Sequence, residues 1–290
     1  MKDLSKPGTG GPIKGKVVGQ FFGIFNGIPA DRYQHIVNTA PFDKCNLLIL
    51  AFVRTVKSNG VFTAHFTNVR DDQRPATKGD MDQDRVMQVV KRARAMNSEI
   101  KILISLGWGN TDAGNAATTP TPFAESVASI VKTCDLDGFD IDYEDEPDVE
   151  PKDMFKLARA LNDALSKITP TRERIITITP AQEKGLDKNV LDTFTYTMPQ
   201  SYDHGGDGTK VDWYKDTLGS FDRIVYGLNI EGDIGKSDDP RKFAKEAISN
   251  HAAGLFAWRL DNDSVDPQTK YPTFASGKLM WELMRPTEDA

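Results

Sequence analysis

Eight short runs of apolar and β-branched residues recur along this chain of 290 residues, with amphipathic stretches between them. The runs occupy residues 17–25, 45–53, 100–109, 136–144, 175–182, 194–203, 223–231 and 254–263. Their near-continuous apolar character is typical of strands that are covered on both faces. Apolar residues at three- and four-residue spacing predict helices over 81–96, 121–134, 153–168 and 240–252. Alternating strands and helices indicate a parallel sheet joined by crossover helices.

This pattern predicts a single (β/α)8 TIM barrel without a large inserted domain, because eight such units fill about 250 residues. The main alternative is an open, doubly wound sheet. Its dinucleotide-binding form needs G-x-G-x-x-G after the first strand, and FFGIFNGIP at 21–29 does not provide it. The segment 56–80 is long enough for a hairpin that turns at Ser58-Asn59-Gly60. Asp239 before Pro240 is a plausible helix start.

The ends of the chain suggest one domain after a short lead-in. Residues 1–15 are polar and rich in glycine, so we expect a flexible lead-in there and one catalytic domain over residues 16–290. The lead-in lacks the apolar core of a signal peptide. We expect a soluble protein, secreted or cytoplasmic. Cys45 and Cys134 lack the short spacing of a zinc or redox pair and are expected to be buried free thiols.

The charge balance and the lack of long apolar stretches each argue against one class of partner. Lys and Arg total 36 against 42 for Asp and Glu, a net charge of −6, and no cluster of basic residues stands out. Nucleic-acid binding relies on such clusters, so no nucleic acid is expected. No stretch approaches the roughly 18 to 20 apolar residues that cross a bilayer, so no membrane is expected either.

The most unusual segment is DGFDIDYE at residues 137–144. Successive side chains of a strand point to opposite faces, so Asp140, Asp142 and Glu144 would share one face. The aromatic and aliphatic residues between them would cover the other face. The sequence therefore predicts a row of carboxylates on a buried strand.

Three carboxylates spaced about 6.5 to 7 Å apart cannot all be ionised cheaply in a barrel interior. Their mutual repulsion should raise at least one pKa towards neutrality, as a general acid requires. Glu144 is the best candidate, because it is nearest the open mouth and has the longest reach. A magnesium site is the first alternative, since hard cations take clustered carboxylates. A purely structural role is the second, although it would misplace the apolar residues that alternate with the acids.

Other polar and aromatic residues fall at the carboxyl ends of the predicted strands, where a barrel of this type carries its chemistry. Met198, Gln200 and Tyr202 share one face of the sixth strand, and Trp258 lies within the eighth. Further candidate contacts at the predicted mouth are Asp203, Asn229, Glu231 and Arg259. His204 is more simply a loop residue, since it has no paired ligand.

DGFDIDYE resembles the D-x-x-D-x-D-x-E signature on the fourth strand of family 18 glycoside hydrolases. Asp137, Asp140, Asp142 and Glu144 occupy its four acidic positions. Four weaker similarities occur in the same order along the chain and extend the resemblance over approximately residues 16 to 284. These are Ala51-Phe52 at the end of the second strand, SLGWG at 105–109, MPQSYD at 198–203 and FAWRLD at 256–261.

The resemblance implies hydrolysis of β-1,4 linkages after N-acetylglucosamine, with retention of configuration and with the substrate's acetamido group as nucleophile. It implies that Glu144 protonates the leaving oxygen and later activates water. Asp142 then orients the acetamido N–H, and Asp140 tunes Asp142 by sharing a proton. Tyr202 and Gln200 hold the acetamido carbonyl. No metal, no cofactor and a monomer are expected.

Further substrate contacts implied by the resemblance are Trp258, as the apolar floor under the sugar, with Phe52, Met198, Trp108 and Asp203. Trp108 departs from the family pattern, because it replaces the second glycine of S-x-G-G. Its ring either narrows the site or adds a stacking surface.

Three functions follow as alternatives. An endo-acting chitinase fits best, because residues 232–253 leave no room for a large insertion and the cleft should be open. An endo-β-N-acetylglucosaminidase that cuts N-glycan cores is the second. An inactive chitin-binding, lectin-like relative is the third, but such relatives typically lose the acid at the position of Glu144. A magnesium-dependent enzyme on the same barrel lacks a visible phosphate loop or basic clamp.

Overall fold

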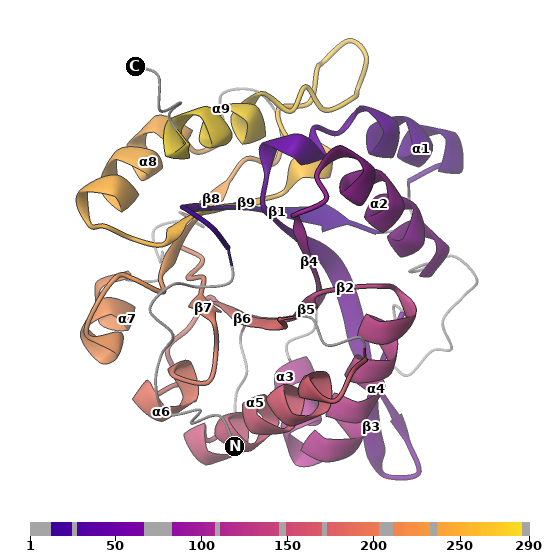
Figure 1. The fold of residues 1–290 in the computed structure, drawn as a ribbon, viewed down its shortest axis with the longest axis vertical. Coiled ribbons are helices and arrows are strands. Elements are labelled where there is room, and N and C mark those ends of the chain that lie inside the picture. The colour runs from indigo at the N-terminus through magenta and orange to yellow at the C-terminus, as the bar shows by residue number, and fades with distance from the viewer. Residues whose placement is uncertain are drawn as a thin grey trace.

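The fold comes from a computed structural model, in which strands form a central ring and helices lie around it (Figure 1). The structure describes residues 13–24, 28–66, 83–107, 111–144, 149–169, 173–202, 211–232 and 237–285. Residues 1–12 of the expected lead-in lie outside these ranges. No helix in the described part of the chain combines the length and apolar character that a membrane span needs.

Eight parallel strands form the ring. They are β1 (Val17–Gly23), β2 (Leu47–Ser58), β4 (Lys101–Leu106), β5 (Gly138–Tyr143), β6 (Ile175–Pro180), β7 (Tyr196–Thr197), β8 (Val225–Asn229) and β9 (Gly254–Trp258). Their order is β7-β6-β5-β4-β2-β1-β9-β8. A parallel bridge between Thr197 and Ile224 joins the two ends. The predicted (β/α)8 barrel is confirmed, with a strand in each of the eight predicted runs.

Helices cover the outside of the ring. They are α1 (Ala30–Thr39), α2 (Gln83–Met96), α3 (Asp112–Thr118), α4 (Pro120–Thr133), α5 (Pro151–Ser166), α6 (Lys188–Leu191), α7 (Val211–Leu218), α8 (Pro240–Ser249) and α9 (Ala275–Met284), with 3-10 turns η1 (Phe42–Lys44) and η2 (Leu260–Asn262). The four predicted helices are present as α2, α4, α5 and α8. Helix α8 ends before residue 252, because His251 adopts a left-handed φ of 56°. Its predicted start is confirmed: the Asp239 side chain accepts a hydrogen bond from the backbone N–H of Arg241.

The predicted hairpin is confirmed outside the ring. Strand β3 (Val61–His65) pairs antiparallel with the extension of β2. Asn59 and Gly60 both have positive φ, 50° and 82°, as a two-residue hairpin turn requires. The hairpin lies beside α4 (Figure 1), and the backbone N–H of Ala64 donates to Ser126 Oγ on that helix.

Two apolar cores follow from the alternation of side chains along the strands. The residues of one core fill the barrel interior, and those of the other lie between strands and helices. On β5 the residues Phe139, Ile141 and Tyr143 belong to the outer core, so Asp140 and Asp142 face inwards. The predicted face of the acidic row is therefore correct.

Both cysteines are buried free thiols, as predicted. Burial raises the thiol pKa of Cys45, which the carboxylate of Asp43 raises further, and burial raises that of Cys134 to about 11. Both thiols are therefore protonated at neutral pH.

Candidate active site

Asp140 is the deepest carboxylate of the row and is completely buried. Ser105 Oγ on β4 donates to its Oδ2 over 2.6 Å. Thr177 and Thr179 on β6 donate their hydroxyls to its Oδ1 over 2.5 and 2.9 Å. Burial raises the pKa of Asp140, while these hydrogen bonds oppose that rise. Hydroxyls from both neighbouring strands thus hold the carboxylate in place.

The hydrogen bonds of Asp140 add partners that the sequence did not indicate. Its oxygens accept from three hydroxyl groups, while the expected sharing of a proton with Asp142 stays a prediction. The carboxylates still interact through charge, because Asp140 contributes to raising the pKa of Asp142. Thr177 and Thr179 were not predicted as site residues, although their alternation in IITITP places both on the inner face of β6.

Asp142 lies two residues nearer the mouth. Burial raises its pKa well above the usual value, and the charges of Glu144 and Asp140 raise it further. The prediction that like charges raise at least one pKa in the row is confirmed at this residue. Gly107 leaves room for the side chain: a Cβ atom there would lie 2.6 Å from Asp142 Oδ2. Gly107, the first glycine of SLGWG, therefore leaves the space that the Asp142 side chain occupies.

Glu144 follows the last residue of β5 and is exposed. Gln200 links it to the row, because its Nε2 donates to Glu144 Oε1 over 2.7 Å and to Asp142 Oδ1 over 2.8 Å. One side-chain amide from beyond β7 thus bridges the two outer carboxylates. The bridge confirms that Gln200 points into the mouth beside the acidic row.

Tyr202 completes this chain of hydrogen bonds, since its hydroxyl donates to Gln200 Oε1 over 2.7 Å. Burial raises the pKa of Tyr202 well above the usual value. The negative charges of Asp142, Glu144, Asp238 and Glu231 raise it further. The phenol therefore keeps its proton and can donate. Tyr202 and Gln200, which were expected to hold the same acetamido carbonyl, are hydrogen-bonded to each other.

Trp258, at the end of β9, presents its ring over other aromatic side chains. It stacks on Phe52 with ring centroids 5.7 Å apart and an interplanar angle of 19°. Its centroid lies 5.5 Å from that of Phe21. The peptide bonds Ala51–Phe52 and Trp258–Arg259 are both cis.

Phe52 and Met198, both expected to contact substrate, lie in the core of the barrel interior. Met198 is completely buried and Phe52 is nearly so. Side chains on the inner face of a strand contribute to core packing unless they lie at its open end. Phe52 therefore supports Trp258 from beneath, and the half-buried indole carries the exposed apolar surface.

Glu231, just beyond β8, accepts three hydrogen bonds. Trp258 Nε1 donates to its Oε2 over 2.8 Å. Asn262 Nδ2 and Arg259 Nε donate to its Oε1 over 2.8 and 3.1 Å. Burial acts to raise the pKa of Glu231, but Arg259 and the hydrogen bonds outweigh it and lower the pKa. The sequence placed Glu231 and Arg259 at the mouth without indicating that they hold each other.

Other residues that the sequence singled out lie outside the described ranges or away from the mouth. Trp108, Asp203 and His204 lie outside the described residues. Asp137 lies at the far end of β5, where its Oδ2 accepts from Arg94 Nη2 and from the backbone N–H of Ile102, both over 2.9 Å. Its role is therefore to fasten β5 to α2 and β4.

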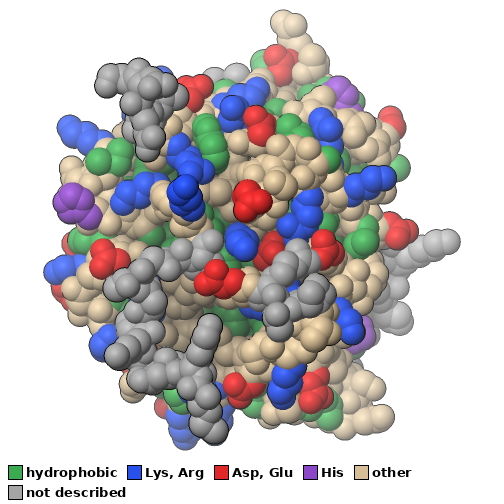
Figure 2. Space-filling model, viewed as in Figure 1, with side chains coloured by type: hydrophobic (Ala, Val, Ile, Leu, Met, Phe, Trp, Pro, Cys, Tyr) green, Lys and Arg blue, Asp and Glu red, His purple; other side chains and the backbone are tan. Residues whose placement is uncertain are grey.

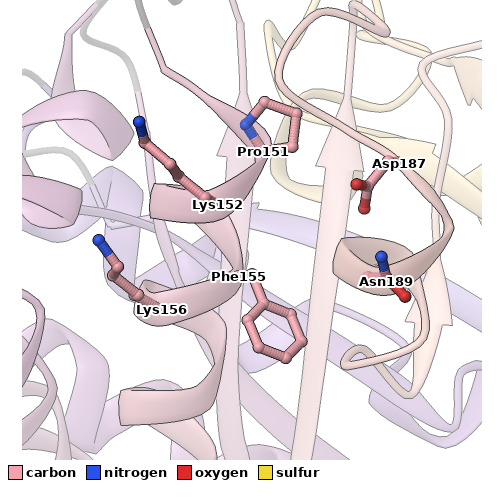
Figure 3. Close-up of a pocket in the computed structure, with 6 residues that line it drawn as sticks. All are labelled: Pro151, Lys152, Phe155, Lys156, Asp187 and Asn189. Atoms are coloured by element: carbon pink, nitrogen blue, oxygen red, sulfur yellow. The ribbon is translucent and has the colours of Figure 1, made fainter.

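The described residues also form a surface pocket of about 430 Å³ between α5 and α6 (Figure 3). Its lining comprises Pro151, Lys152, Phe155, Lys156, Asp187 and Asn189. None of them belongs to the acidic row, so the pocket is separate from the candidate site. On the face in Figure 2, acidic and basic side chains are intermixed. No group of three or more His, Cys, Asp or Glu side chains within the described ranges is arranged to hold a metal ion.

A parallel (β/α)8 barrel with bridged carboxylates and an indole at the carboxyl ends of its strands has the architecture of a glycosidase. Residues 26–277 match the family described as glycosyl hydrolases family 18, so the chain belongs to that family of glycosidases. No curated protein sequence matches the chain.

Solved structures share the fold. A chitinase from Bacteroides thetaiotaomicron superposes with a TM-score of 0.68 and 19% identity, covering 96% of this chain and 99% of that one. Chitinase ChiW from Paenibacillus sp. str. FPU-7 has a TM-score of 0.70 and 15% identity; the match covers 95% of this chain but only 33% of the ChiW chain. The chitinase-like agglutinin RobpsCRA from Robinia pseudoacacia has a TM-score of 0.68 and 12% identity, covering 93% and 100%. Chitinases and an agglutinin share this barrel, so the activity has to be argued from the site.

Proposed function

We propose that this protein is a retaining, endo-acting chitinase that hydrolyses β-1,4-linked N-acetylglucosamine by substrate-assisted catalysis. The observation that carries the proposal is the Gln200 bridge, which holds Asp142 and Glu144 side by side at the mouth. The agglutinin-like alternative is disfavoured by the complete row and by the Tyr202 hydroxyl that joins it. The chitinases among the structural neighbours are consistent with the substrate class.

Glu144 would act first as acid and then as base. It is exposed at the mouth, so it can reach the oxygen between two sugars. It donates its proton to that oxygen. At the same time the acetamido carbonyl oxygen of the sugar that contributes the anomeric carbon attacks that carbon. The glycosidic bond breaks, the leaving chain departs with the proton, and an oxazolinium ion remains. Glu144 then takes a proton from a water molecule, and the oxygen of that water attacks the anomeric carbon. The oxazolinium ring opens, and the product keeps the anomeric configuration of the substrate.

Asp142 would steer the acetamido group. Gln200 occupies its Oδ1, which leaves Oδ2 for the acetamido N–H and for the positive charge that develops there. The charge of Glu144 raises the pKa of Asp142, so loss of that charge would favour ionisation of Asp142.

The environment of Glu231 favours an internal nucleophile. An ordinary retaining glycosidase places a second carboxylate about 5 Å from the acid, where it attacks the sugar. Both oxygens of Glu231 accept hydrogen bonds from Trp258, Arg259 and Asn262. A carboxylate held in this way is a poor nucleophile, whereas the substrate's acetamido oxygen is already positioned next to the anomeric carbon.

The open barrel supports internal cutting. Helix α8 provides ten of the residues between β8 and β9, which leaves only short connections on either side. Without an inserted domain to form a wall, a polymer can lie across the mouth in both directions. The products should therefore be a mixture of oligomers rather than only disaccharides removed from one end.

Product analysis tests the proposal. Chitin oligomers and a high-mannose glycopeptide are incubated separately with the wild-type protein, and the products are analysed by mass spectrometry and, immediately after cleavage, by NMR. We expect cleaved chitin oligomers whose new reducing ends are initially β. Cleavage of the glycopeptide alone would identify an endo-β-N-acetylglucosaminidase instead. Binding without cleavage would identify a lectin-like relative, and an initial α-anomer would overturn retention.

Glu144→Gln tests the acid. The amide keeps the shape and an oxygen for the Gln200 hydrogen bond, but it cannot transfer the proton. We expect kcat to fall by about 10²- to 10⁴-fold while oligomer binding, measured by calorimetry, persists. Full activity in this variant would contradict the assignment. Treatment with EDTA is a parallel control, because loss of activity would contradict a scheme that uses no metal.

A further inference from the structure

We propose that Glu231 is a positioning residue that sets the orientation of the Trp258 indole and thereby the affinity for substrate. The inference deepens the proposed function, on which the identity of the sugar ligand rests. Glu231 then neither donates a proton nor contacts the sugar directly. Its effect passes through a single hydrogen bond, from Trp258 Nε1 to Glu231 Oε2.

The aromatic contacts of Trp258 do not fix the orientation of its indole completely, and the hydrogen bond to Glu231 supplies the missing restraint. Stacking on Phe52 sets the plane of the indole, and the Phe21 ring, tilted by 57° to the indole, limits its lateral movement. The indole turns about its Cβ–Cγ bond, and a half-turn restores the same ring plane with its edges exchanged, so stacking by itself does not select one of the two orientations. A hydrogen bond to a charged acceptor is directional and stronger than one to a neutral group. The bond to Glu231 therefore fixes which edge of the indole points outwards.

Glu231 is itself held on several sides, as a positioning residue requires. Arg259 and Asn262 donate to its Oε1, and both follow Trp258 in the chain. Its backbone N–H donates to Asn229 Oδ1 over 2.8 Å, and its backbone pairs with that of Asp263 in an antiparallel bridge. The carboxylate thus joins the end of β8 to the segment that follows β9.

The charge of Glu231 is compensated locally. Arg259 approaches to 3.1 Å, and its guanidinium also lies 5.5 Å from the centroid of the Trp258 ring. The same arginine lies 3.3 Å from Asp261 Oδ2, whose Oδ1 accepts from the backbone N–H of Gly23 on β1. The network that holds the indole therefore reaches from β8 through β9 to β1.

A double-mutant cycle tests whether Glu231 acts through the indole. Affinity for N-acetylchitotetraose is measured by calorimetry in the Glu144→Gln background, which prevents turnover. Glu231→Ala should weaken binding by about 10-fold, the equivalent of one charged hydrogen bond. Trp258→Phe keeps an aromatic ring but has no N–H, so Glu231→Ala added to it should cost less than about twofold. An equal loss in both backgrounds would overturn the proposal.

A substrate-independent measurement separates this proposal from the proposed function. The indole N–H signal of Trp258 is assigned in a ¹H–¹⁵N spectrum by its disappearance in Trp258→Phe. Glu231→Ala should shift that signal upfield and speed its exchange with solvent, because the carboxylate acceptor is lost. An unchanged signal would overturn the positioning role even if the protein proves not to bind chitin oligomers.

Two matched variants serve as controls. Glu246→Ala removes a carboxylate from the exposed face of α8 and should change neither the affinity nor the indole signal. Asn262→Ala removes another donor to Glu231 without touching the indole, so it should move the signal less than Glu231→Ala does. If Asn262→Ala shifts the signal as strongly, the effect is general loosening of the segment, and the assignment to the Glu231 bond is wrong.

Discussion

At the residue scale, the environment of Asp142 disfavours its charged form. Asp142 is the inward-facing acid between Asp140 and Glu144, and both charges add to the effect of burial. The Gln200 hydrogen bond opposes the rise in pKa but does not outweigh it. The protein thus retains a group that destabilises the fold when ionised, which is understandable if its position serves catalysis.

Asp142→Asn should therefore stabilise the protein in a pH-dependent way. The folded-state pKa lies above the unfolded value, so the wild type loses stability as pH rises from the unfolded pKa through the folded one. The amide does not ionise, so we expect the variant's advantage in Tm to be small near pH 4 and to grow towards pH 8. Each kcal/mol recovered should add about 2–4 °C. Activity should fall at every pH.

Thermal unfolding measured across this pH range checks the prediction. Asp163→Asn, at an exposed position on α5, makes the same chemical change outside the acidic row and is the matched control. A Tm difference for Asp142→Asn that stays constant with pH would show that its charge is not the cause.

Gly107 and Gly138 offer a contrast between two glycines on neighbouring strands. A Cβ at Gly107 would meet side-chain atoms, at 2.6 Å from Asp142 Oδ2, 2.7 Å from Asp142 Cβ and 2.8 Å from Phe52 Cε1. A Cβ at Gly138 would meet backbone, at 1.8 Å from the carbonyl oxygen of Ile175. Side chains can move aside, whereas the backbone of a paired strand cannot do so without breaking the ladder.

Gly107→Ala should therefore fold but lose activity. We expect a cost of about 1–3 kcal/mol in the free energy of unfolding and a fall of about 10²-fold in kcat/KM, because Asp142 is displaced. Gly138→Ala should instead prevent soluble expression. Denaturant unfolding and chitin-oligomer kinetics measure the two effects. Wild-type kinetics for Gly107→Ala would show that Asp142 need not occupy its present position.

At the element scale, a buried ion pair fastens the extension of β2 to α3. Arg54 Nε pairs with Asp112 Oδ2, and both side chains are almost completely buried. Asp112 Oδ1 also accepts from the backbone N–H and the hydroxyl of Thr55. The pair lies just beyond Phe52, so it secures the part of β2 that leaves the barrel for the hairpin.

Asp112→Ala should cost about 3–5 kcal/mol in the free energy of unfolding, because it leaves the Arg54 charge buried without its partner. The double variant Arg54→Met, Asp112→Leu removes both charges and fills similar space, so it should be more stable than the single variant. Urea unfolding of the two proteins gives the comparison. A single variant as stable as the double would mean that water solvates Arg54 once Asp112 is removed.

At the scale of the whole molecule, the barrel closes unevenly. Strands β1 and β2 pair through five residue pairs, from Gly19 with Leu47 to Gly23 with Ala51. Strand β7 has two residues, and its backbone pairing towards β8 in the described part of the chain is one bridge, between Thr197 and Ile224. The β7–β8 seam should therefore open at lower free energy than the rest of the ring.

Native-state hydrogen exchange tests the seam. The amide of Thr197, which donates to the carbonyl of Arg223, should exchange faster than the amides that β1 and β2 share. Bound chitin oligomer should slow that exchange if Gln200 and Tyr202, which follow β7, engage the substrate. Uniform exchange around the ring would show that the neighbouring helices compensate for the short strand.

Much of this architecture could be predicted from local patterns. Strands buried on both faces are apolar throughout, so the sequence predicted the number of strands. The alternation in DGFDIDYE also predicted correctly which side chains of β5 face inwards. The turn at Asn59-Gly60 and the helix start at Asp239 were also readable, because single residues there meet backbone requirements that few others meet. The end of α8 and the burial of Met198 were not, because they depend on how the helix and strand pack.

The sequence by itself determined the barrel, the inward face of the acidic row and the strand ends at which polar residues gather, because each depends on residues close together in the chain. Only the tertiary structure decided which of these groups bond to one another. Gln200 meets Asp142 across 58 positions of the chain, and Trp258 meets Glu231 across 27. Such pairs are set by the register and closure of the ring, which bring distant strand ends to the same mouth, and no local periodicity encodes that proximity.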